Sequence, residues 1–203
     1  MNDPQSLLEK ADLLRARVNV AYSAAANSPE QNHPFPIGRK LAEDLGYPPE
    51  VLDNLPQFSV EAFAGVSNVS LFADLPPGAT VLDLGCGAGM DSFVAAWRVG
   101  PAGRVIGVDF SEAMVTRARA AKKLANLPQL DFQQGDAERL SLPDETVDVV
   151  LANGIFNLNP KRSQILSEIL RVLRPEGHAY IAELILTRPL PEGDAASESN
   201  WFA

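Results

Sequence analysis

From residue 79 onward, short apolar runs alternate with stretches in which apolar residues recur every three or four positions. The runs predict five strands, and the periodic stretches predict helices between them. Strands are expected at residues 79–84, 104–108, 130–134, 147–152 and 179–186. Helices are expected at residues 90–99, after a capping Ser111 and after Asn159-Pro160, and a turn at residues 174–177. Strands alternating with helices form parallel sheets with right-handed crossovers, so we predict a doubly wound, mostly parallel α/β fold.

The first part of the chain has a different pattern. Leu7, Ala11, Leu14 and Val18 recur on one face of an expected amphipathic helix that begins near Pro4. Prolines interrupt residues 28–36, a short helix is expected over residues 39–45, and residues 47–77 are expected to form short helices and loops. We therefore divide the chain into a mobile N-terminal helical cap, residues 1–77, and an α/β domain, residues 78–203.

Composition narrows the class of partner. The chain has 203 residues, a net charge of −9 and one cysteine, Cys86. The acidic balance argues against nucleic acid or an anionic membrane as the main partner, because phosphate binding needs concentrated Lys and Arg. There is no secretory signal pattern and no apolar run long enough to cross a membrane. A single cysteine allows no internal disulfide, so a cytoplasmic location is expected.

The strongest motif follows the first expected strand. Gly85, Gly87 and Gly89 form a G-x-G-x-G turn between a strand and a helix, the place where an open α/β sheet binds its ligand. A dinucleotide-binding turn needs a small residue at position 90, and this chain has Met90. The spacing therefore favours S-adenosylmethionine (SAM) over a dinucleotide, the alternative being a purely structural glycine turn.

Two acidic positions follow at the ends of the next strands. Asp109 ends the second strand, where a carboxylate can accept hydrogen bonds from both ribose hydroxyls. Its alternative role is a helix cap, which Ser111 already fills. Asp136 and Ala137 follow the third strand, where an acidic side chain and a backbone N–H can read the edge of adenine. The alternative there is an ordinary Gly-Asp turn.

These motifs carry a family resemblance. Residues 79–186 resemble class I SAM-dependent methyltransferases of the group that includes the ubiquinone and menaquinone enzymes. From residue 45 onward the chain more closely resembles the arsenite methyltransferase family. That closer resemblance is carried by residues 45–51, 63–68, 99–109 and 153–158.

The resemblance implies a role for each matching position. Asp83 and the loop glycines would line the methionine and ribose portion of SAM, and Asp109 would hold the ribose. Phe110 and Met114 would flank adenine, or pack in the core. Asp136 and Ala137 would read the adenine edge. Asn153 would border the methionine group and a small-molecule substrate, over which the cap, with Tyr22 and Tyr47, would close unless these tyrosines belong to the core.

The chain departs from the arsenite methyltransferases at their arsenic-binding cysteines. Trivalent arsenic prefers soft thiolate ligands, but residues 65–68 and 153–155 hold no cysteine. Cys86 lies in the glycine turn, where a small residue fits. Three hypotheses follow: arsenite methylation with external thiols, methylation of an organic acceptor such as a quinone-like ring, and a catalytically silent SAM-binding or assembly protein. We name no catalytic residue, because SAM already carries an activated methyl group, and no metal site, because His33 and His178 are isolated.

The end of the chain is a second departure. Class I methyltransferases usually have seven strands, and prolines 189 and 191 break any strand beyond the expected fifth. Either the chain is a truncated form, or the exposed sheet edge is covered by another chain, which would make it a homo-oligomer.

Overall fold

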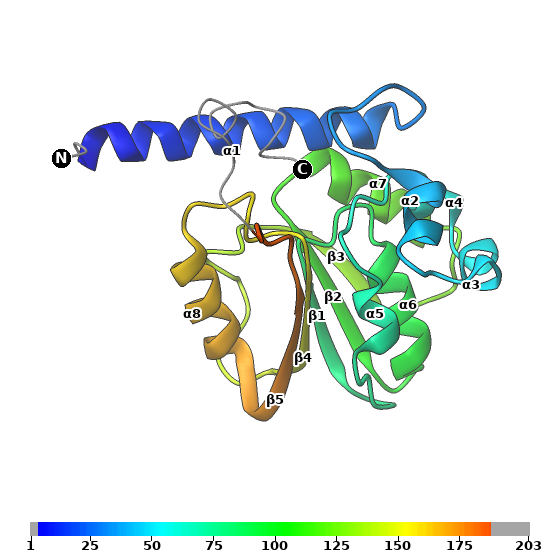
Figure 1. Ribbon diagram of the computed structural model, residues 1–203. Coiled ribbons are helices and arrows are strands. Elements are labelled where there is room, and N and C mark those ends of the chain that lie inside the picture. The colour runs from blue at the N-terminus through cyan, green and yellow to red at the C-terminus, as the bar shows by residue number, and fades with distance from the viewer. Residues whose placement is uncertain (1–3, 188–203) are drawn as a thin grey trace.

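The computed structural model describes residues 4–187, with side chains from residue 13. Its centre is a five-stranded sheet with the order β3-β2-β1-β4-β5, in which every neighbouring pair is parallel. The strands are β1 Thr80–Leu84, β2 Arg104–Asp109, β3 Leu130–Gln134, β4 Val147–Asn153 and β5 Leu173–Ala182. The prediction of a doubly wound, parallel α/β fold is confirmed (Figure 1).

Helices cover both faces of the sheet, as the term doubly wound requires. Alternate residues of β1 show this arrangement. Val81 packs with α6 (Met90–Val99) and α7 (Glu112–Lys122) in one core, whereas Leu82 and Leu84 pack with α8 (Arg162–Val172) in another. Since side chains alternate across a strand, the continuous apolar run of β1 is explained by burial on both faces.

The last strand differs from its prediction. The turn expected at residues 174–177 lies inside β5, which follows α8 without a loop. There the pairing with β4 jumps from Leu173 to His178, and Glu176 has a φ of 67°. The strand also ends at Ala182, four residues earlier than expected, because Glu183 turns back to accept hydrogen bonds from the backbone of Phe156 and Asn157. The start of α8 also differs from its prediction, since the helix begins at Arg162, two residues after Asn159-Pro160.

The N-terminal part is helical, as expected. Helix α1 (Pro4–Asn27) runs along the top of the molecule in Figure 1, across the carboxyl ends of the strands. Four short helices follow: α2 Gly38–Asp44, α3 Pro49–Asn54, α4 Gln57–Glu61 and α5 Val69–Phe72. Their apolar residues, Tyr47 and Phe63 among them, share one core with α6 and the sheet. The expected amphipathic face of α1 includes the buried Val18, while the side chains of Leu7 and Ala11 lie outside the described residues.

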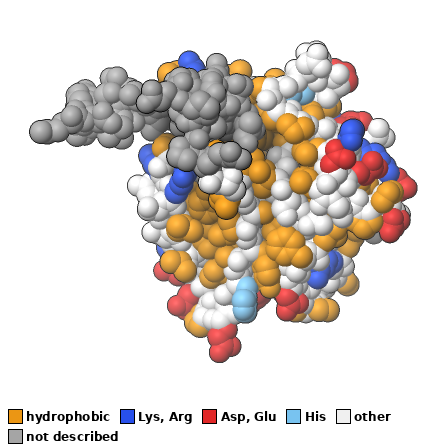
Figure 2. All heavy atoms as spheres, viewed as in Figure 1, with side chains coloured by type: hydrophobic (Ala, Val, Ile, Leu, Met, Phe, Trp, Pro, Cys, Tyr) orange, Lys and Arg blue, Asp and Glu red, His pale blue; other side chains and the backbone are white. Residues whose placement is uncertain are grey.

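Strand β5 leaves one edge of the sheet open among the described residues. Figure 2 shows apolar side chains gathered on this side of the molecule. The exposed large apolar residues of β5 and α8 are Ile181, Leu166 and Leu170, whose exposed fractions are 40%, 45% and 74%. Within residues 4–187, no helix is both long enough and apolar enough to cross a membrane.

Candidate functional site

A cleft lies at the carboxyl edge of the sheet, under α1. The loops that follow β1, β2, β3 and β4 form its walls, and Arg15, Val18 and Tyr22 of α1 form its roof. Nine of the ten predicted cofactor residues line it: Asp83, Gly85, Gly87, Asp109, Phe110, Met114, Asp136, Ala137 and Asn153. Gly89 does not line it. The topology brings these residues together because parallel strands deliver their carboxyl ends to one edge.

Gly85 and Gly89 are required by the backbone for different reasons. Gly85 has a φ of +73°, and a Cβ atom there would overlap the side chain of Ile155. Gly89 has a φ of +88°, and its Cβ atom would lie 2.5 Å from Cζ of the buried Phe132. Only glycine adopts such a φ without strain. Gly85 therefore keeps the backbone turn open at the cleft, whereas Gly89 faces the core and lets α6 begin close against β3.

Asp109 is held at the end of β2 by backbone donors. Its Oδ2 accepts from Gly87 N at 2.9 Å, and its Oδ1 accepts from Ser111 N at 2.8 Å. The residue is 8% exposed, and this burial raises the pKa of the carboxyl to about 6. Each carboxylate oxygen keeps a second lone pair for a ligand. Ser111 caps α7 through the N–H of Met114, as predicted.

Asp83 and Asp91 are two buried carboxyls behind the glycine turn. Ser92 Oγ donates to Asp83 at 2.5 Å. Burial raises the pKa of Asp83, and the neighbouring Asp91 raises it further. Burial also raises the pKa of Asp91, against the hydrogen bonds that it accepts from the hydroxyls of Ser70 and Tyr47. Tyr47, 1% exposed, is therefore a core residue that does not line the cleft.

Asn153 holds this network, whose Asp83 and Asp91 also line the cleft, against the loop at residues 66–67. Its Oδ1 accepts from the backbone N–H groups of Val66 and Ser67 at 2.9 and 3.1 Å. Its Nδ2 donates to Ser67 O and to Asp91 Oδ2 at 2.7 and 2.9 Å. The amide therefore fixes the loop around residues 65–68, in addition to bordering the cleft.

The loop after β3 bounds another part of the cleft. Asp136 is paired with Arg15 of α1, whose guanidinium lies 6.0 Å above the ring of Phe110. Met114 is 1% exposed and lines the cleft next to the glycine turn. Phe110 and Met114 both border the cleft, and of the two only Met114 also belongs to a buried core among the described residues.

Sequence reasoning missed Arg15, Asp91 and Ser59. Asp91, two residues after the last loop glycine in the first turn of α6, could have been found from that position. Nothing in the sequence places Arg15, because its partner Asp136 is 121 residues away. Ser59 lines the cleft, and its buried hydroxyl has no hydrogen-bond partner among the described residues. Such an orphaned hydroxyl in the lining fits a cleft built for a polar ligand.

The lining of the cleft includes the one cysteine of the chain, Cys86. Cys86 is 8% exposed, and burial, with the charges of Asp109 and Asp83, raises the pKa of its thiol well above the usual value. The thiol is therefore neutral near pH 7 and a weak ligand. Among the side chains of residues 13–187, no group of three His, Cys, Asp or Glu residues could hold a metal ion.

A glycine turn after β1, a carboxylate ending β2 and an acidic loop after β3 define a nucleotide-type cofactor cleft of the class I methyltransferase fold. A family of methyltransferase domains matches residues 75–202, and the chain belongs to this family. The family and its structural neighbours assign SAM as the cofactor of this fold, as predicted.

The chain is similar in sequence or structure to several known methyltransferases. The chain is 38% identical to an arsenite methyltransferase of Halobacterium salinarum over 151 residues, which are 74% of this chain and 38% of that protein. It is 40% identical to a demethylmenaquinone methyltransferase of Lactobacillus johnsonii over 50% of this chain and 42% of that protein. An arsenic(III) SAM methyltransferase of Chlamydomonas reinhardtii matches in structure with a TM-score of 0.61 and 31% identity, over 83% of this chain and 57% of that one. The chain thus spans less than half the length of the two curated relatives named here.

Proposed function

We propose that the chain binds SAM in the cleft and transfers its methyl group to a small-molecule acceptor. The observation that carries the proposal is Asp109: a buried carboxylate at the end of β2, oriented by Gly87 N–H and Ser111 N–H, with lone pairs left for a ribose diol. The two backbone donors offset part of the cost of burying this charge, and the hydroxyls of a ribose would supply two further donors.

Each wall of the cleft would hold one part of the cofactor. Gly85, Gly87 and Asp83 would face the methionine and ribose portion, and Asp109 would bind the ribose hydroxyls. Phe110 and Met114 would flank the adenine ring. Asp136 and the backbone of Ala137 would read the adenine edge. Asn153 would border the methionine group and, by fixing the loop at residues 66–67, shape the acceptor side of the cleft.

The residues of this chain would align the acceptor with the methyl group and exclude water from the cleft. Bound SAM supplies a sulfonium-activated methyl group, so transfer needs alignment of the acceptor nucleophile and exclusion of water. Val18 and Tyr22 of α1 cover the cleft, and Tyr22 stacks on Phe35 with ring centroids 4.6 Å apart. A soft, electron-rich acceptor requires no general base, so we assign no catalytic side chain.

For the acceptor, we propose arsenite presented as an adduct with external thiols. The arsenic-methylating relatives support this choice. A second candidate is an organic acceptor such as a quinone-like ring. It is favoured by the apolar lining from Phe63, Ile155 and Leu158, and by the single, buried thiol of Cys86. A cytoplasmic location and self-association through the edge of β5 stay predictions.

Transfer of labelled methyl from SAM to arsenite, with glutathione present and near-stoichiometric protein, tests the proposal. Methylated arsenic is the expected product. If a quinone-like acceptor is labelled instead, the organic candidate replaces arsenite. Binding of SAM without transfer to either acceptor would contradict the enzymatic proposal and support a silent SAM-binding protein.

The affinity for the product S-adenosylhomocysteine is expected to fall in acid. Ribose hydroxyls donate to the ionised form of Asp109, so binding favours the deprotonated carboxyl, whose pKa is about 6 in the free protein. Kd should be flat above pH 7 and rise up to about tenfold per pH unit below 6. Calorimetric titration from pH 5 to 8 measures this, and Asp109→Asn should remove the dependence. A flat profile in the unaltered protein would contradict the role of Asp109.

A further inference from the structure

Helix α1 forms the roof of the cleft through one of its faces. Arg15, Val18 and Tyr22 are spaced i, i+3 and i+7, which places them on the same side of the helix. All three line the cleft, and Val18 is only 1% exposed. A molecule held between Asp136 and Asn153 would therefore lie beneath α1.

The carboxyl end of α1 is fixed by buried contacts. Ala25 and Ala26 are 0% and 3% exposed and pack in a core with residues of the cleft wall. Arg117 of α7 donates to Ala26 O at 2.8 Å, and the hydroxyls of Ser23 and Ser111 lie 3.2 Å apart. Opening the roof at this end would expose apolar surface and break these two hydrogen bonds.

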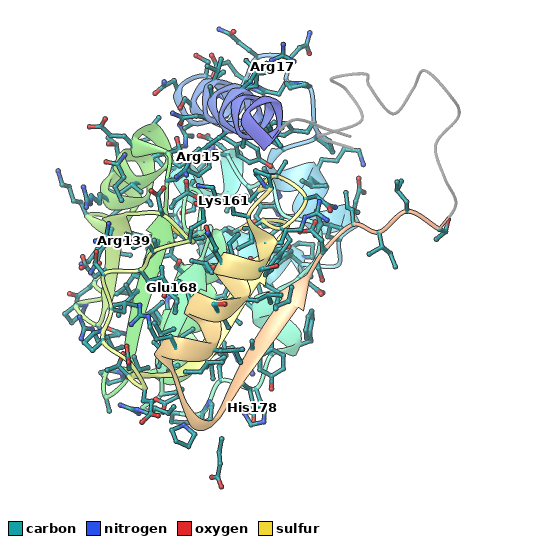
Figure 3. The ribbon with its side chains drawn as sticks, turned by 90° about the vertical axis from the view of Figure 1, so that its left-hand side faces the viewer. Arg15, Arg17, Arg139, Lys161, Glu168 and His178 are labelled. Atoms are coloured by element: carbon teal, nitrogen blue, oxygen red, sulfur yellow. The ribbon has the colours of Figure 1, made fainter. Side chains whose placement is uncertain are left out.

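Toward the amino end of the roof, α1 is held by ion pairs of Arg15. Arg15 pairs with Oδ1 of Asp136 and, at 3.3 Å, with Oε1 of Glu138. Glu138 is itself enclosed, with a side chain 10% exposed, and accepts from Asn159 at 2.9 Å and from Lys161 at 3.0 Å. In Figure 3, Arg15 and Lys161 lie near each other between α1 and α8. One ionic cluster thus joins α1, the loop after β3 and the loop before α8.

This arrangement is compatible with an occupied cleft. Arg15 uses Oδ1 of Asp136, and among the described residues no donor is bound to Oδ2. That second oxygen is free for the amino group of adenine. The guanidinium also lies over Phe110, so it closes the same end of the cleft from above.

We propose that Arg15 is a latch: its ion pairs with Asp136 and Glu138 hold α1 over the bound cofactor and break when the cofactor leaves. The helix opens at the Arg15 side because this attachment is ionic and partly exposed, whereas the attachment at Ala25 and Ala26 is buried. Arg15 is thus a positioning residue, acting on cofactor exchange. The inference rests on the proposed function, since it requires SAM to bind in the cleft.

The test is the rate at which bound SAM leaves. Protein loaded with labelled SAM is chased with unlabelled S-adenosylhomocysteine and sampled by rapid filtration. Arg15→Gln is expected to speed dissociation about tenfold, since loss of one member of a partly buried charge pair acts mainly on the off-rate. Arg15→Lys should be intermediate. Added salt should speed release from the unaltered protein and change Arg15→Gln little.

A matched control is Arg39→Gln, because Arg39 also bonds two carboxylates, Glu43 and Asp53, but lies outside the cleft. Its off-rate should be unchanged. Hydrogen exchange should rise around residues 15–18 of Arg15→Gln and stay constant at residues 24–27. An off-rate within twofold of the unaltered protein, or a slower one, would overturn the latch. Failure of the unaltered protein to retain SAM would refute the proposed function itself, and the latch with it.

Discussion

Asp109→Ala is expected to weaken SAM binding by about a hundredfold or more. Two charge-assisted hydrogen bonds to the ribose would be lost, and each contributes on the order of 1.5–3 kcal/mol. The same carboxylate accepts from Gly87 N–H, so the glycine turn also loses its hold on the end of β2. Calorimetric titration with SAM gives the Kd directly.

The control for this variant is Asp74→Ala, because Asp74 is exposed and lies outside the cleft. Its affinity should equal that of the unaltered protein. Circular dichroism and thermal melting establish that Asp109→Ala is folded. A folded Asp109→Ala protein with an affinity within threefold of the original would mean that the ribose is not held at the end of β2.

Asp91→Ala is expected to lower the free energy of unfolding by about 3–5 kcal/mol. The buried carboxyl accepts from Tyr47, Ser70 and Asn153. Its removal takes the short hydrogen bond from the two buried hydroxyls, while the Asn153 amide keeps only its bond to Ser67 O. Each unsatisfied buried group costs about 1–3 kcal/mol. The melting temperature should fall by about 10 °C, given roughly 2–4 °C per kcal/mol for a chain of this size.

Asp144→Ala provides the comparison. Asp144 pairs with Arg171, but its side chain is 74% exposed, so its loss should cost less than about 1 kcal/mol. Thermal or urea unfolding of both variants separates a buried hydrogen-bonding centre from a surface ion pair. Equal stability losses in the two variants would refute the central position of Asp91 in the network behind the cleft.

The five parallel strands and the placement of the cleft could be predicted because both follow from local patterns. Alternation of apolar runs with helical periodicity predicted four of the strands to within a residue, whereas β5 begins six residues and ends four residues earlier than expected. Once the strands are parallel, their carboxyl ends must meet, and so must Asp83, Asp109 and Asn153. The glycine turn carries its own signal, because Gly85 has a backbone conformation that other residues rarely adopt.

The features that the sequence did not predict depend on contacts between distant parts of the chain. Gly89 belongs to the same motif as Gly85, but it faces Phe132 of β3, which the spacing of the motif does not reveal. Arg15 meets Asp136 only because α1 lies across the finished sheet edge. The early end of β5 follows from Glu183, whose carboxylate binds the backbone of the loop after β4. The spacing of apolar residues along the chain indicates which positions are buried. None of these contacts alters that spacing, so the sequence pattern does not reveal them.

A crystal structure of the chain with S-adenosylhomocysteine would show whether Asp109 holds the ribose. The proposed binding mode predicts ribose hydroxyls within hydrogen-bond distance of the Asp109 carboxylate, with adenine between Phe110 and Met114 and its edge at Asp136 and Ala137. A ligand bound elsewhere, or one whose ribose does not contact Asp109, would contradict it.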